Sequence, residues 1–209
     1  MTNKTAIATA VVVAVGAALV VAVVLRSQRS GETRRAAIDE QTVVMFGDSI
    51  TEQGDWDRLL SDHRISNHGY SGFTSEQLVP VAQQVAAQQP RAVYILAGTN
   101  DIRDGHAASW TSAQVARIID AFAQQSPDTR IVLQTITPRA DATQQVSAAN
   151  QALAALADER GVALLDIHTP LDDGSGGLRP QDTNDGLHLS DAGYDRWVAA
   201  LLEDLRSAS

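Results

Sequence analysis

Four short segments of this chain carry side chains that could together catalyse acyl transfer. The first is Gly47-Asp48-Ser49-Ile50, which follows an apolar run and places a serine hydroxyl where a strand turns into a helix. The backbone N–H of such a serine lies near a helix N-terminus, where a developing oxyanion is stabilised. Gly-Asp-Ser is also a common turn sequence, so this tetrapeptide indicates little by itself.

Two further segments could supply hydrogen-bond donors to that oxyanion. Residues 67–72 contain Gly69 and Gly72, and a glycine lets the backbone approach a ligand closely and present a bare N–H. Asn100, in Gly98-Thr99-Asn100-Asp101, could donate from its carboxamide. Each segment has a plain structural alternative, which is a simple loop for the glycines and an Asx turn for Asn100.

The fourth segment is Asp185-Gly186-Leu187-His188-Leu189-Ser190. An Asp three residues before a His can fold back and hold one ring nitrogen, which leaves the other nitrogen free to accept a proton from a serine. The alternative is an ordinary loop in which Ser190 caps the helix that follows.

In this order the four segments resemble the SGNH hydrolase family, also called GDSL esterases and lipases. The resemblance runs from Thr42 to the C-terminus, and its one departure is Ile50, where Leu is more usual. It implies no metal and no organic cofactor. It also implies a serine hydrolase that cleaves carboxylic esters through an acyl-enzyme.

The resemblance assigns a role to each candidate residue. His188 is expected to deprotonate the nucleophile Ser49, while Asp185 fixes the imidazole tautomer. The oxyanion hole is expected to consist of the N–H groups of Ser49 and Gly72 and the side chain of Asn100. Gly69 is the alternative to Gly72, and the Ser-Gly spacing favours Gly72.

The elements that must position these residues alternate between apolar runs and helical patterns. Such alternation predicts a three-layer α/β/α sandwich with a five-stranded parallel sheet, the flavodoxin-like SGNH hydrolase fold. A flavodoxin-like nucleotide binder would share the sheet, but the chain has no phosphate-cradling glycine loop after the first strand. The predicted strands are Thr42–Phe46, Arg64–Asn67, Ala92–Ala97, Ile131–Thr135 and Ala163–Ile167. The predicted helices are Trp56–Ser61, Ser75–Gln88, Ala113–Gln124, Thr143–Arg160 and one from Ser190 to Arg206.

The composition of the chain disfavours several kinds of partner and chemistry. The chain has 209 residues, a formal net charge of −9 and no cysteine. The negative charge disfavours nucleic acid as a partner, and the absence of cysteine excludes thiolate chemistry. Four histidines outside the fourth segment have no compact ligand spacing, so we expect surface or loop positions for them and no metal site. They are His63, His68, His106 and His168.

The N-terminal part of the chain is distinct. Ala6–Leu25 is long and apolar enough for a transmembrane helix, which predicts an anchor in residues 1–25, a polar tether in residues 26–41 and the hydrolase domain in residues 42–209. A cleaved signal peptide is the alternative. The domain is then expected at the cell membrane on a single-pass anchor. The arginines after the segment favour the cytoplasmic side, whereas the habit of the family favours the outside.

The expected substrate is a small-molecule, carbohydrate or lipid ester. Aromatic residues make up only 4% of the chain, which disfavours a large lipid pocket and favours short acyl or acetyl groups. A lysophospholipase or thioesterase acting at the membrane is the alternative among enzymes. A non-catalytic ligand-binding module of the same fold is the alternative from another class.

Overall fold

The computed structural model describes residues 38–207, which contain a five-stranded sheet in the order β2-β1-β3-β4-β5. Every neighbouring pair in this sheet is parallel. The strands are β1 (Val43–Gly47), β2 (Ile65–Gly69), β3 (Ala92–Leu96), β4 (Arg130–Gln134) and β5 (Ala163–Leu165). The predicted five-stranded parallel sheet is confirmed.

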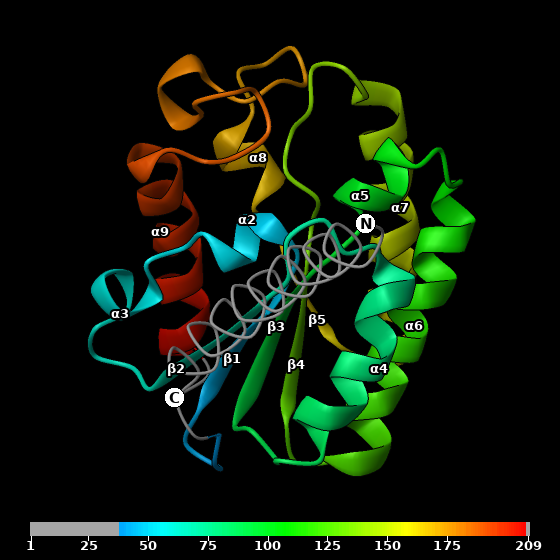
Figure 1. The fold of residues 1–209 in the computed structure, drawn as a ribbon, viewed down its shortest axis with the longest axis vertical. Coiled ribbons are helices and arrows are strands. Elements are labelled where there is room, and N and C mark those ends of the chain that lie inside the picture. Colours follow the sequence, from blue (N-terminus) through cyan, green and yellow to red (C-terminus); the bar gives the residue numbers. More distant parts are fainter. Residues whose placement is uncertain (1–37, 208–209) are drawn as a thin grey trace, which may run out of the picture. The chain divides into compact units, whose positions relative to one another are not determined.

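Helices cover both faces of the sheet, as Figure 1 shows. One face carries α4 (Ser75–Ala86), α6 (Ala108–Gln125) and α7 (Thr143–Arg160). The other carries α3 (Trp56–Leu59), α8 (His168–Leu171) and α9 (Asp191–Ser207). Single turns of helix follow β1 and β3, namely α2 (Ser49–Glu52) and α5 (Thr99–Arg103), and a 3₁₀ turn spans Pro180–Asp182.

The apolar core is divided between the two faces because side chains alternate along each strand. In β1, Val44 and Phe46 belong to the cluster packed against α4, α6 and α7, whereas Val43 and Met45 belong to the cluster packed against α9. β1 is buried on both faces and correspondingly apolar, as is usual in parallel sheets with helices on each side. The second cluster includes Tyr194 and Trp197 of α9, which are buried as core residues.

Two expectations about β2 were wrong. The strand ends at Gly69 rather than at Asn67, and it therefore includes His68, which we expected on the surface or in a loop. His68 is only 5% exposed, because it pairs in register with Phe46 and shares the buried face of that residue. The backbone of β1 continues alongside through Gly47, so the polar residues of β2 stay in the ladder.

No helix within residues 38–207 is long and apolar enough to cross a membrane. The predicted anchor, including Ala6–Leu25, and most of the predicted tether lie outside the described residues.

Candidate active site

Ser49 lies at the carboxyl end of β1, as the first residue of α2. Asp48 is the N-cap of this short helix, and its Oδ1 accepts a hydrogen bond from the Ile50 N–H at 2.9 Å. Gly47 lets the turn pass close to β3, since a Cβ there would lie 2.3 Å from the Leu96 carbonyl oxygen. The result is a serine that is only 7% exposed, at the edge of the sheet where parallel α/β folds form their sites.

The structure brings Ser49, His188 and Asp185 together. Ser49 Oγ is 3.1 Å from His188 Nε2, and His188 Nδ1 is 2.7 Å from Asp185 Oδ2. A carboxylate only accepts hydrogen bonds, so Nδ1 carries the ring proton and donates to Asp185. Nε2 is then the free acceptor facing the serine hydroxyl, which is the arrangement a general base needs.

A tight turn holds Asp185 and His188 in this geometry. Asp185 Oδ1 accepts the N–H groups of Leu187 and His188 at 2.9 and 2.7 Å. Gly186 lies between them with φ +84°, a conformation that favours glycine. The hydrogen bond from the His188 ring, followed by those from the two backbone N–H groups, lowers the pKa of Asp185 to about 2. Asp185 is therefore ionised at neutral pH, as the orienting partner of a basic histidine should be.

The structure also separates the two glycine candidates for the oxyanion hole. The Gly69 N–H already donates to Asn67 Oδ1 at 2.9 Å, and a Cβ at Gly69 would lie 2.1 Å from the Glu52 nitrogen. Gly69 thus serves the close packing of α2 on β2. Gly72 lies in the turn after β2 with φ +76° and has nothing within 4 Å of the position of a Cβ, so it stays the candidate donor.

Asn100 lies in α5, directly after β3, and is 6% exposed. Its Nδ2 donates to the Phe73 carbonyl oxygen at 2.9 Å, which ties it to the loop that contains Gly72. Its Oδ1 accepts from Arg103 Nη1 at 2.8 Å. An Asn side chain carries two Nδ2 hydrogens, so one remains for a ligand after the bond to Phe73 is made.

Sequence reasoning missed two residues that hold this region together, Asp101 and Arg103. Asp101 is fully buried, and it accepts hydrogen bonds from the Ser75 N–H at 2.8 Å and the Ser75 Oγ at 2.6 Å. This pair joins α5 to the first residue of α4, the helix that follows the Gly72 loop. The only sequence signal was the position of Asp101 next to Asn100, because its partner lies 26 positions away.

Asp48 is a buried carboxyl group beside the nucleophile. Its Oδ2 has no hydrogen-bond partner among the described residues, and burial raises its pKa to about 7. The Ile50 N–H and the nearby charge of His188 oppose that rise, while Asp101 adds to it. A negative charge at Asp48 therefore interacts favourably with a positive charge on His188.

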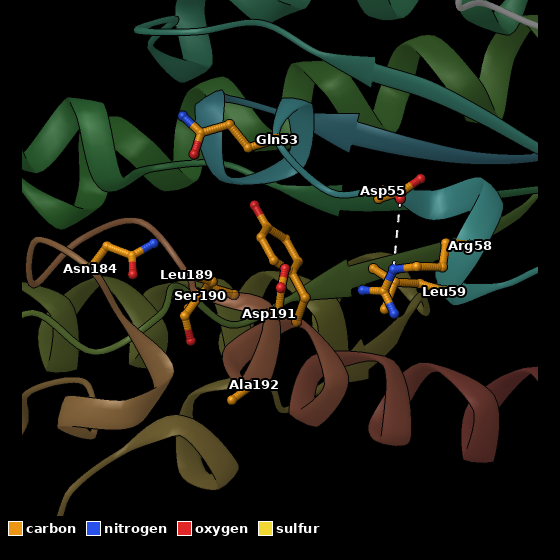
Figure 2. A pocket seen from close by; sticks show the side chains of 10 residues that line it. Gln53, Asp55, Arg58, Leu59, Asn184, Leu189, Ser190, Asp191 and Ala192 are labelled. Carbon is orange, nitrogen blue, oxygen red and sulfur yellow. Dashed lines mark ion pairs between the residues drawn. The ribbon is translucent and has the colours of Figure 1, made fainter.

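A polar cleft of about 380 Å³ lies next to the turn that carries Asp185 and His188. Figure 2 shows it between the α2–α3 connection and the start of α9, with the ion pair between Arg58 and Asp55 (3.6 Å) at one end. Asn184 and Leu189, which flank the turn, also line the cleft. Its other polar lining residues are Gln53, Ser190, Asp191 and Tyr194. Polar groups of this kind suit a hydroxylated ligand.

Within residues 38–207, no group of three or more His, Cys, Asp or Glu side chains could hold a metal ion.

A serine, a histidine and an aspartate linked by hydrogen bonds at the carboxyl edge of a five-stranded parallel sheet define a serine-hydrolase type of site. The chain belongs to the GDSL-like lipase/acylhydrolase family, whose profile matches residues 45–196. The matched segment contains Ser49, Gly72, Asn100, Asp185 and His188. The resemblance noted from the four segments is therefore confirmed at the level of the family.

Individual relatives are more distant. The chain is 26% identical over 166 residues to platelet-activating factor acetylhydrolase IB subunit alpha1 of Pongo abelii, covering 74% of this chain and 71% of that protein. It is 25% identical over 173 residues to the Homo sapiens protein of the same name, covering 78% and 74%. A GDSL-like lipase from Bacteroides thetaiotaomicron has the same fold, with a TM-score of 0.75 and 24% identity over 88% of this chain and 97% of that one.

Proposed function

We propose that this chain is a serine esterase that hydrolyses carboxylic esters through an acyl-enzyme on Ser49. The observation that carries the proposal is the continuous set of hydrogen bonds from Ser49 Oγ to His188 Nε2 (3.1 Å) and from His188 Nδ1 to Asp185 Oδ2 (2.7 Å). A serine hydroxyl is a weak nucleophile until an adjacent base removes its proton, and this arrangement supplies the base and its orienting carboxylate.

In the acylation step, Ser49 Oγ attacks the ester carbonyl carbon while His188 Nε2 takes the hydroxyl proton. The carbonyl oxygen becomes an oxyanion, which accepts hydrogen bonds from the N–H groups of Ser49 and Gly72 and from Asn100 Nδ2. The tetrahedral intermediate then collapses, the bond to the alcohol oxygen breaks, and His188 returns its proton to that oxygen. Water then attacks the acyl-serine by the same steps, with His188 as the base, and the carboxylic acid is released.

We further propose short acyl groups, acetyl in particular, and a polar or hydroxylated alcohol. Two relatives at 25% and 26% identity are named as acetylhydrolases, which supports the acetyl group. The alcohol must lie on the His188 side of the ester, because in this mechanism the histidine delivers the proton to the alcohol oxygen. The polar cleft adjoins the turn that carries His188, although neither Ser49 nor His188 lines it, and we propose it as the place for polar groups of the alcohol.

The test is hydrolysis of p-nitrophenyl acetate, butyrate and octanoate by the full chain in mild detergent. We expect turnover that is fastest on acetate and that disappears in Ser49→Ala. Ser175→Ala, which alters an exposed serine in the loop after α8, is the matched control and should keep full activity.

The other outcomes separate the alternatives. A preference for octanoate indicates a lysophospholipase or thioesterase instead of a short-chain esterase. Turnover that survives in Ser49→Ala rules out the serine mechanism. A folded protein that hydrolyses none of the esters, yet binds a polyol or sugar ester, indicates a ligand-binding module on the same fold.

A further inference from the structure

The carboxamide of Asn100 is held at both of its polar atoms. Nδ2 donates to the Phe73 carbonyl oxygen at 2.9 Å, and Oδ1 accepts from Arg103 Nη1 at 2.8 Å. A carbonyl can only accept and a guanidinium can only donate, so each partner demands one end of the amide. Rotating the carboxamide by half a turn would break both bonds and bring like groups together. The amide therefore has one orientation, in which Nδ2 lies next to the Gly72 loop.

The Arg103 side chain is 49% exposed, and its other donors are taken up by the adjacent Asp104. It comes one helical turn after Asn100 in α5, the spacing at which side chains of a helix meet. Its Nε and Nη2 donate to the two carboxylate oxygens of Asp104, at 2.7 and 3.1 Å. These bonds, with the charges of Asp104, Asp101 and Asp48, raise the pKa of Arg103, so the group stays cationic.

All three guanidinium nitrogens thus have partners within the chain. Arg103 is for this reason better suited to hold Asn100 than to bind a substrate anion. A cation at Oδ1 also draws electron density out of the carboxamide, and this makes the Nδ2 hydrogens stronger donors, since linked hydrogen bonds polarise one another.

We propose that Arg103 is a positioning residue for the oxyanion hole, which fixes the Asn100 carboxamide with Nδ2 toward the reacting carbonyl and strengthens it as a donor. The inference rests on the proposed esterase function, in which Asn100 is an oxyanion donor. It adds a residue that touches neither the substrate nor the catalytic serine and histidine.

The first test compares Arg103→Met and Arg103→Lys with Arg117→Met. Arg117 is a matched control, because it is an exposed arginine on α6 that bonds only to Gln114 among the described residues. We expect kcat on p-nitrophenyl acetate to fall about tenfold in Arg103→Met with little change in KM, as for an interaction made in the transition state. Arg103→Lys keeps the positive charge but loses the planar set of guanidinium N–H donors, so its kcat should lie between those of Arg103→Met and the parent.

A double-mutant cycle shows whether Arg103 acts through Asn100. We expect Asn100→Ala to lower kcat by about 10²–10³-fold, as for the loss of one oxyanion donor. Adding Arg103→Met to Asn100→Ala should then cost no further activity. A full, multiplicative tenfold loss in the Asn100→Ala background, or unchanged kcat in Arg103→Met alone, would overturn the proposal.

A readout that needs no turnover separates this inference from the proposed function. The side-chain amide resonance of Asn100 can be assigned by its loss in Asn100→Ala. We expect it to shift in Arg103→Met and to stay in place in Arg117→Met. If the parent protein hydrolyses no ester but the resonance responds, the esterase function fails and the positioning contact stands. A resonance that does not respond to Arg103→Met contradicts the contact itself.

Discussion

The carboxyl group of Asp48 lies in the first turn after β1, where it is about 1% exposed and has one oxygen without a hydrogen-bond partner among residues 38–207. Burial raises its pKa from 3.8 to about 7 in the folded protein. The protonated form is therefore favoured by folding. Its contribution to stability is complete below about pH 4 and is lost as the pH rises through about 7.

Asp48→Asn should remove this pH dependence. We expect the free energy of unfolding of the variant to exceed that of the parent increasingly between about pH 4 and pH 8, by up to about 4 kcal/mol at about 1.4 kcal/mol per pKa unit. Urea unfolding of both proteins across this range measures the difference. Two parallel stability profiles would show that Asp48 does not titrate in the way its burial implies.

Asp185 has the opposite shift, since its pKa is lowered to about 2 by the His188 ring and two backbone N–H groups. Its contribution to stability is present above about pH 4 and is lost as the pH falls through about 2. Asp185→Asn should leave the backbone bonds to Oδ1 in place while its Nδ2 faces His188 Nδ1, which forces the proton onto Nε2. We expect kcat to fall about 10³-fold or more, because that tautomer cannot accept the serine proton.

The measurement is kcat on p-nitrophenyl acetate for Asp185→Asn beside Asp173→Asn, which alters an exposed aspartate in another Asx turn. An Asp185→Asn variant with more than a tenth of the parent activity would show that the carboxylate does not set the tautomer.

Between elements, the contact of α5 with α4 determines where the Gly72 loop lies. Asp101 joins them through its two hydrogen bonds to Ser75. We expect Asp101→Ala to lower the free energy of unfolding by about 2–4 kcal/mol, because it leaves the buried Ser75 hydroxyl and N–H without their acceptor. Urea unfolding tests this, with the exposed Asp57→Ala on α3 as the control. A loss below about 0.5 kcal/mol would mean that the bridge is replaceable.

The elements differ in how far the sequence predicts them. All five strands were found. β1 and β3 are buried throughout and leave clear apolar runs. The signal is weaker in β2, which is polar after Ile65, and in β5, where Leu164 is exposed. Of the four single-turn helices in residues 38–207, only α3 was predicted, as Trp56–Ser61, whereas α2, α5 and α8 were not, since four or five residues show little helical periodicity. The predicted β2 ends at Asn67, whereas the observed strand continues to Gly69. The polar residues Asn67 and His68 do not look like part of a strand in the sequence, although both pair with β1.

The candidate site could also be predicted only in part. Ser49, Gly72, Asn100, Asp185 and His188 were singled out by the resemblance of four short segments, in order, to the SGNH family, because each segment taken alone also fits an ordinary turn or loop. Asp101 is the last residue of one of these segments and Arg103 follows it two positions later, but both owe their importance to contacts, with Ser75 and Asn100 respectively. Such contacts follow from the packing of α5 on its surroundings, which no pattern along the chain expresses.

At the scale of the whole molecule, we propose that Ala6–Leu25 attaches the catalytic domain to a membrane. The full chain should remain in the membrane fraction after alkaline carbonate extraction. Val13→Arg combined with Leu19→Arg should release it, because each arginine near the centre of a membrane-spanning segment costs about 2.5–3.5 kcal/mol of insertion free energy. An intact-mass measurement on the parent separates a retained anchor from a cleaved signal peptide. Full extraction of the parent would contradict the anchor.

All the reactive groups lie at the carboxyl edge of the sheet. The opposite, amino edge carries none of them, and we call it the supporting end of the domain. The exposed turn through Gln88 and Gln89, between α4 and β3, belongs to the supporting end. Exposed turns of this kind tolerate inserted sequence. A fluorescent protein, an affinity tag or a surface linker could therefore be grafted between these two residues while the opposite end stays open to substrate. Because this turn lies at the end opposite the reactive groups, attachment through it would immobilise the protein with its reactive edge facing the solution.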